Sequence, residues 1–179
     1  MKKNSVLLTI AILFTVVFLG WAGCRIYKSI IFDFQCGAFL KRAAEANTVE
    51  IAKEELAKAL EYIEEQELTS GIVSIFLRNP SNDVSFWYNN ISAAQDELMN
   101  LPEDATALER TNVLMKLRES LTDRSDGNTA VTHPAGISVY PHNVLYFWWG
   151  LISLVGVSTF WTWWGINIGL IKVEETKKK

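Results

Sequence analysis

The sequence is poor in the residues that build small reactive centres. It contains two cysteines and two histidines, and neither His133 nor His142 has a Cys, Asp or Glu at a recognised metal-ligand spacing. It also lacks a glycine-rich phosphate loop and a serine-centred nucleophile motif. We therefore expect no metal site, no cofactor and no catalytic residue. The alternative of a membrane enzyme that uses dispersed carboxylates has no residue triplet to support it.

Charge is missing from two long stretches of the chain. Residues 5–24 and 144–171 carry no Asp, Glu, Lys or Arg and are rich in large apolar side chains. About 20 apolar residues in a helix cross a bilayer core roughly 30 Å thick. The sequence therefore predicts two transmembrane helices, at residues 5–24 and 143–171, with short tails at 1–4 and 172–179.

The intervening segment, residues 25–142, is acidic and lacks a basic patch. It holds 11 Lys or Arg against 18 Asp or Glu, a net charge of −7. This balance disfavours nucleic acid as a partner.

The basic residues of the tails predict the orientation. Lys2 and Lys3 precede the first apolar run, and four lysines follow the second. Because basic residues near the ends of a span resist translocation, both tails are expected in the cytoplasm and residues 25–142 outside it. Arg25 and Lys28, which follow the first apolar run, oppose this orientation, but the six lysines of the two tails outnumber them. We expect a multi-pass protein of the plasma (inner) membrane.

The first apolar run leaves open how the N-terminus is processed. Its length favours an uncleaved anchor, whereas Gly20 and Ala22 would also suit a signal peptidase. The segment from Trp21 to Cys24 resembles the lipobox of bacterial lipoproteins, except that Trp21 stands where that motif has an aliphatic residue. If the helix continues, Cys24 and Cys36 are about 18 Å apart, too far for a disulfide.

Three amphipathic helices are predicted in the acidic segment. Residues 39–67 are rich in helix-forming residues, a second apolar stripe begins at Val84 after a cluster of turn residues, and a third helix opens at Thr106 with a capping box to Glu109. Residues 72–77 could be helix or buried strand. Short connections favour an antiparallel three-helix bundle, after which residues 122–142 return to the membrane as an extended segment, with Ile137 and Val139 alternating around Ser138.

Three consecutive aromatic residues, Phe86, Trp87 and Tyr88, lie on the second predicted helix. Consecutive helical positions point in different directions, so these three cannot share one narrow core stripe. Trp87 fits the core, and at least one neighbour is expected near the surface. We interpret the cluster as a candidate protein contact, since aromatic residues are enriched at interfaces.

The second apolar run carries two candidate features of its own. A first tryptophan pair lies near its start and a second group lies about 20 Å further along a helix, which suits two membrane-interface belts. The members are Trp148, Trp149, Trp161, Trp163 and Trp164. Gly165 and Gly169 form a small-xxx-small pattern around Asn167, a candidate surface for packing against another helix.

The sequence thus predicts an all-α membrane protein and favours a noncatalytic interaction role, as a scaffold or auxiliary subunit. Its expected partners are membrane lipid and either another protein or a second copy of the chain. The alternative is a sensor, because two spans around a helical outer segment resemble, in architecture, the periplasmic half of bacterial chemoreceptors. Only eight residues follow Ile171, so such a sensor would signal through a partner.

Overall fold

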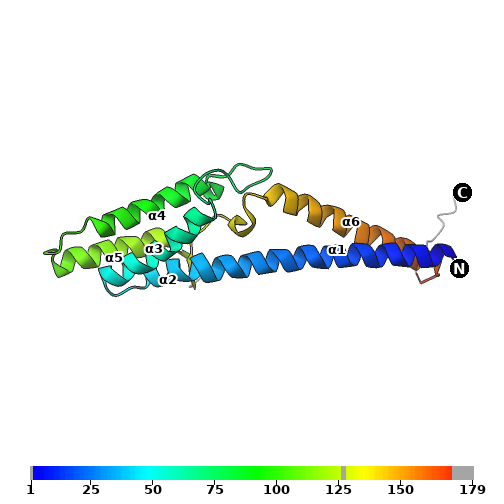
Figure 1. Cartoon of the computed structure of the whole chain (residues 1–179), viewed down its shortest axis with the longest axis horizontal. Helices are drawn as coiled ribbons and strands as arrows, with labels where there is room; N and C mark the ends of the chain where they lie inside the picture. The colour runs from blue at the N-terminus through cyan, green and yellow to red at the C-terminus, as the bar shows by residue number, and fades with distance from the viewer. Residues whose placement is uncertain (1, 126–127, 171–179) are drawn as a thin grey trace, which may run out of the picture. The chain divides into compact units, whose positions relative to one another are not determined.

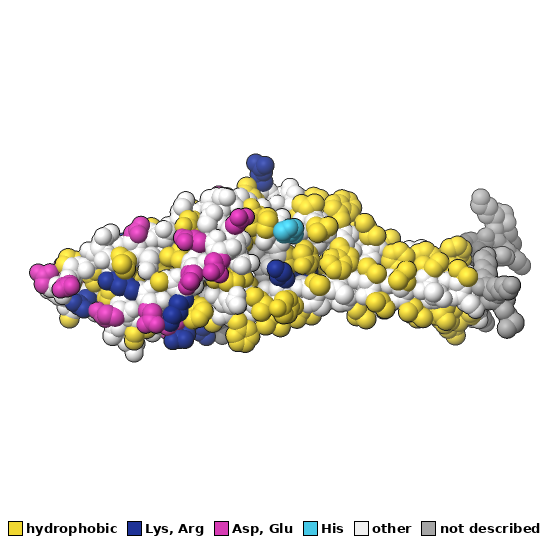
Figure 2. Space-filling model, in the orientation of Figure 1, with side chains coloured by type: hydrophobic (Ala, Val, Ile, Leu, Met, Phe, Trp, Pro, Cys, Tyr) yellow, Lys and Arg dark blue, Asp and Glu magenta, His cyan; other side chains and the backbone are white. Residues whose placement is uncertain are grey.

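The computed structural model describes residues 2–125 and 128–170, and 75% of the chain is helical. The chain forms two compact units. We call residues 1–27 with 144–179 the helix pair, and Lys28–Asn143 the charged unit. Figure 2 shows that acidic and basic side chains gather over the charged unit, while the surface of the helix pair is largely hydrophobic.

Two helices are long and apolar enough to cross a membrane, as predicted. The first is α1 (Lys2–Phe32), which runs without a break into a π-helical turn, η1 (Asp33–Gly37), and then into α2 (Ala38–Ala44). The second is α6 (Asn143–Asn167). The first apolar helix therefore extends well beyond residue 24. The lysines of the C-terminal tail lie outside the described residues.

Within the helix pair, α1 and α6 pack antiparallel (Figure 1). The indole N–H of Trp21 donates to the carbonyl of Tyr146 at 2.7 Å, and that of Trp161 donates to the Thr15 hydroxyl at 2.9 Å. Phe14 stacks on Phe160 with ring centroids 5.3 Å apart. These contacts hold the start of α6 against residue 21 of α1 and the later part of α6 against residues 14–15.

Small side chains allow this close approach. Gly150, Ser153 and Gly156 are buried and recur every third residue along α6. A Cβ atom at Gly150 would lie 2.6 Å from the Trp21 ring, and one at Gly156 would lie 2.5 Å from Phe14 Cγ. Both positions therefore have room for hydrogen only.

The charged unit begins with a helical hairpin in place of the single helix predicted for residues 39–67. The chain leaves the helix at Glu45, and α3 (Val49–Glu65) starts at Thr48, whose hydroxyl accepts the Ile51 N–H at 3.3 Å. The prediction of one continuous helix was wrong because its composition favours helix throughout, whereas this hydroxyl cap and a four-residue turn reverse the chain.

Helices α3, α4 (Val84–Met99) and α5 (Ala107–Leu121) confirm the apolar faces and the helix starts that the sequence indicates. In α3 the residues Val49, Ala52, Leu56, Ala59 and Ile63 are all buried. Helix α4 starts at an Asp83 side-chain cap, and α5 starts with the predicted capping box of Thr106 and Glu109. Four helical segments therefore pack here (Figure 1), since residues 28–44 join the three predicted helices.

The predicted extended return of residues 122–142 differs from the structure. Strands β1 (Thr122–Ser125) and β2 (Asn128–Val131) form an antiparallel hairpin, and Ile137–Val139 form a 3-10 turn, η3, with Ile137 and Val139 both buried. The expected long return is unnecessary. Because α2 precedes α3, helix α5 already runs back toward the end at which the chain enters the charged unit.

In the connection from α3 to α4, residues 72–77 form neither the helix nor the buried strand that the sequence left open. Val73 N–H donates to the Asn82 carbonyl at 3.0 Å and Val84 N–H to the Gly71 carbonyl at 2.9 Å, which pairs the two ends of the connection. Between them lie an irregular loop and a short 3-10 turn, η2 (Pro80–Asn82).

Candidate interaction site

The aromatic cluster of α4 divides as helix geometry requires. Trp87 is 7% exposed, and its indole N–H donates to the Thr132 carbonyl at 2.8 Å. Phe86 is 64% exposed. Tyr88 is half-buried, and its hydroxyl donates to a Glu64 carboxylate oxygen at 2.9 Å, which raises the pKa of Tyr88. The three residues thus supply a core anchor, a surface aromatic and a polar link to α3.

Phe86 and Trp87 border an apolar hollow of about 360 Å³. Its lining comes from the start of α4, the end of α5 and the segment after β2. Besides these two aromatics, the residues that line it are Pro80, Ser81, Asp83, Asn90, Ile91, Ser120, Leu121, Thr132, His133 and Pro134. Because Trp87 is fixed by its bond to Thr132, the hollow is built on a packed base and has an exposed aromatic side chain at its rim.

A second hollow, of about 290 Å³, continues from the first along the seam between α4 and α5. The two share Asn90 and Ser120 among their lining residues. We call the combined surface the α4–α5 groove. From Phe86 to Glu97 it follows about 16 Å of helix, at 1.5 Å per residue. At the Glu97 end, Lys116 Nζ pairs with the Glu97 carboxylate at 2.7 Å.

The groove therefore changes character along its length. Its Phe86 end is apolar, and its Glu97 end carries one ion pair in which both side chains are exposed. Exposed pairs contribute little to folding stability, about 0–1 kcal/mol, so these charges can exchange partners at small cost.

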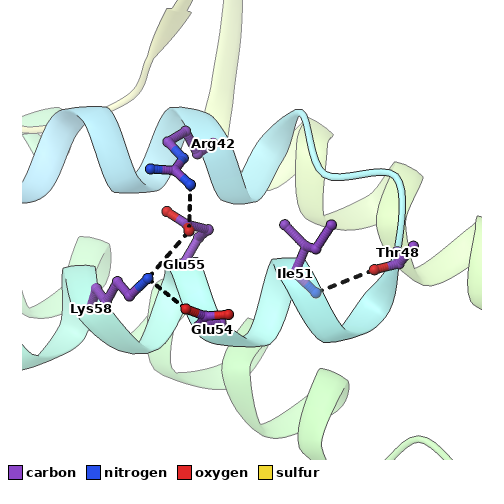
Figure 3. A network of polar contacts seen from close by, with 6 residues as sticks. All are labelled: Arg42, Thr48, Ile51, Glu54, Glu55 and Lys58. Carbon is purple, nitrogen blue, oxygen red and sulfur yellow. Dashed lines mark hydrogen bonds and ion pairs between the residues drawn. The ribbon is translucent and has the colours of Figure 1, made fainter.

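A second cluster of charged residues lies between α2 and α3 (Figure 3). The Glu55 side chain is only 4% exposed, which is unusual for a glutamate on a charged helix. Arg42 reaches Glu55 Oε1 at 2.8 Å, and Lys58 bridges Glu55 and Glu54 at 3.4 and 2.7 Å. Glu55 therefore joins the two arms of the hairpin, which is a structural role.

The predicted packing surface of Gly165, Asn167 and Gly169 does not lie on one continuous helix. Gly165 is buried, but Gly169 lies past the last helical residue, with φ at 77°, and a Cβ there would meet nothing within 4 Å. Leu170 N–H donates to the Gly165 carbonyl at 3.0 Å, as in a Schellman cap. Asn167 donates to the Trp163 carbonyl of its own helix at 2.8 Å.

The five tryptophans proposed as membrane-interface anchors all lie on α6. Trp148, Trp161 and Trp163 are exposed, and Trp149 and Trp164 are partly buried. Trp161 also bonds to Thr15, so one of the five has a packing role inside the helix pair. Sequence reasoning missed the part that Trp21, Gly150 and Gly156 play in the contact between α1 and α6.

The described residues contain no group of three or more His, Cys, Asp or Glu side chains arranged to hold a metal ion. His133 packs edge-on against Phe32, with ring centroids 5.2 Å apart. Cys24 and Cys36 are both free thiols, the first exposed and the second buried.

Comparison of the chain with protein-family models, with curated proteins and with solved structures finds no significant match.

Proposed function

We propose that this chain is a noncatalytic membrane protein whose charged unit binds another protein outside the cytoplasm. In this arrangement α1 and α6 cross the plasma membrane and both tails lie in the cytoplasm. The lysines at both ends of the chain support this orientation, as does the acidic composition of residues 25–142.

The α4–α5 groove is the single observation that carries the proposed binding role. It combines an exposed Phe86, a hollow whose surface is mostly apolar although half of its lining residues are polar, and a base fixed by Trp87. Interfaces place aromatic anchors of this kind beside packed, desolvated pockets. The groove follows about 16 Å of helix, which matches three turns of a partner helix.

The partner that fits best is an amphipathic helix. Its apolar side chains would repeat every three or four residues to fill the two hollows, as in other helix-in-groove complexes. A basic or acidic side chain at one end would compete for Glu97 or Lys116. Such a helix can belong to another protein or to a second copy of this chain.

The test compares two truncations of exposed apolar side chains. The full chain is purified from its native membrane in mild detergent as wild type, as Phe86→Ala and as Leu108→Ala. Leu108 is 69% exposed but does not line the groove, so it is a matched control. We expect Phe86→Ala to reduce the co-purified partner at least tenfold, the effect of losing a hot spot of about 2 kcal/mol.

An equal amount of the same partner with all three proteins would contradict the groove as the binding site. Partner loss with both variants would show a general effect of surface hydrophobicity and would contradict it as well.

A sensor that binds a small apolar ligand is the second candidate. The observation in its favour is the 360 Å³ hollow, which falls within the range of about 300–1,000 Å³ common for ligand sites. Mass spectrometry of a solvent extract of the purified chain separates the two. A stoichiometric small molecule that is absent from Phe86→Ala would favour the sensor.

A further inference from the structure

The connection between α3 and α4 exposes two neighbouring large apolar side chains. We call residues 74–79 the Phe76 loop. Phe76 is 70% exposed and Leu77 is 80% exposed. Single exposed apolar residues are normal on protein surfaces, whereas contiguous exposed apolar side chains are typical of protein or membrane contact sites.

A basic residue follows this apolar pair directly. Arg78 is the only Lys or Arg between Lys58 and Arg110, a stretch that is otherwise strongly acidic. The pattern of two bulky apolar side chains and one arginine is suited to the boundary of a bilayer, where apolar groups enter the acyl region and the cation meets lipid phosphate.

The base of the loop is bonded to the segment that leads into α6. The Tyr140 hydroxyl donates to the Ser70 carbonyl at 2.8 Å. Gly136 lies against Val73, because a Cβ at Gly136 would be 3.4 Å from Val73 Cγ1. The side chain of Asn143, the first residue of α6, donates to the Gly136 carbonyl at 3.0 Å.

These bonds limit how far the loop can lie from the start of the apolar helix. Val73 contacts Gly136, and Gly136 is hydrogen-bonded to Asn143. From Val73 to Phe76, three residues of extended chain span at most about 10 Å. If α6 begins to cross the membrane near Asn143, the loop tip can therefore reach the lipid headgroups.

We propose that the Phe76 loop is a membrane-interface anchor, in which Phe76 and Leu77 insert among anionic phospholipids and Arg78 binds their phosphates. This inference rests on the proposed membrane crossing of α6. Its consequence is mechanical, because a lipid-bound loop fixes the start of α4, and with it Phe86 in the α4–α5 groove, at a set height above the bilayer.

The test uses photo-crosslinking in vesicles. The full chain is reconstituted in phosphatidylcholine with phosphatidylglycerol, with benzoylphenylalanine in place of Phe76, Leu77, Leu108 or Leu145, one position at a time. Leu145 lies on α6 and reports the membrane crossing, whereas Leu108 is an exposed control on α5. After irradiation, intact mass shows whether one phospholipid has been added.

We expect lipid adducts at Phe76, Leu77 and Leu145 and none at Leu108. Adducts at Leu145 without adducts at Phe76 and Leu77 would overturn the anchor and leave the membrane crossing standing. A crosslink to a second copy in place of lipid would also overturn the anchor. Absence at Leu145 would contradict the crossing of α6, and the anchor with it.

The charge contribution is tested separately. With the probe at Leu77, Arg78→Gln is expected to lower the adduct yield about fivefold in vesicles that contain phosphatidylglycerol, since one basic residue near an anionic surface contributes about 1 kcal/mol. In pure phosphatidylcholine, whose phosphate is balanced by its own choline, the decrease should be smaller. An unchanged yield in both lipids would refute the phosphate contact.

Discussion

Replacing Gly156 by alanine should destabilise the packing of α1 against α6, although it adds a single methyl group. The new Cβ would lie 2.5 Å from Phe14 Cγ, whereas ordinary contact begins at 3.4 Å, so Phe14 must retreat by about 1 Å. Because Cγ is the root of the ring, turning the ring about its own axis gives no relief. Overpacking of this kind costs about 1–3 kcal/mol.

Alanine also favours helix over glycine by about 1 kcal/mol, which partly offsets this cost. A matched control cancels that contribution. Gly20 lies on α1, and a Cβ there would meet nothing within 4 Å. The unfolding midpoints of Gly156→Ala and Gly20→Ala should therefore differ by the overpacking cost alone, which corresponds to about 2–12 °C at 2–4 °C per kcal/mol.

The assay is thermal unfolding of the full chain in mild detergent, followed by tryptophan fluorescence. The fluorescence signal reports mainly on the helix pair, since only Trp87 of the 7 tryptophans lies in the charged unit. We expect Gly156→Ala to unfold at a lower temperature than Gly20→Ala. Equal midpoints would refute the contact between Gly156 and Phe14.

Three further outcomes are expected. Thr106→Ala should destabilise the charged unit by about 1 kcal/mol in thermal unfolding followed by circular dichroism, because it removes the hydroxyl that caps α5; an unchanged midpoint would show that the capping box does not hold. The bond to Glu64 raises the pKa of Tyr88, so its stabilisation is complete below the unfolded pKa of about 10 and is lost as pH rises through the raised folded value. The difference in thermal unfolding midpoint between wild type and Tyr88→Phe should accordingly vanish at high pH. A difference that grows with pH would show that the Tyr88 hydroxyl does not donate to Glu64. The mass of the intact protein should correspond to a chain that begins at Met1, because cleavage near Cys24 would remove most of α1. A mass that corresponds to a chain beginning at a lipid-modified Cys24 would contradict this.

The helices of the charged unit could be predicted where periodicity and capping agree. The stripe from Val49 to Ile63 is buried throughout, and Thr106 with Glu109 forms the expected box. The reversal before Thr48 was missed because Ala, Glu and Lys favour helix on both sides of it. Its only local signal was Asn47-Thr48, and a possible cap in a helix-forming sequence does not by itself end a helix.

The candidate sites show the same limit. Phe86 and Trp87 were identified because adjacent helical residues cannot both face one stripe, but the α4–α5 groove also needs Thr132 and Pro134, which only the fold brings there. The contact between α1 and α6 left a signal in the regular spacing of Gly150, Ser153 and Gly156. The spacing of Gly165 and Gly169 predicted a packing surface instead, yet the helix ends before Gly169.

The topology of the chain is the central claim, and one measurement tests it most directly. A reporter that is active only outside the cytoplasm is fused after Lys179 in one version and inserted after Gly127 in another. The account predicts activity at Gly127 and none at Lys179. Activity at Lys179 and none at Gly127 would place the charged unit in the cytoplasm, and activity at both positions would show that the chain does not cross the membrane twice.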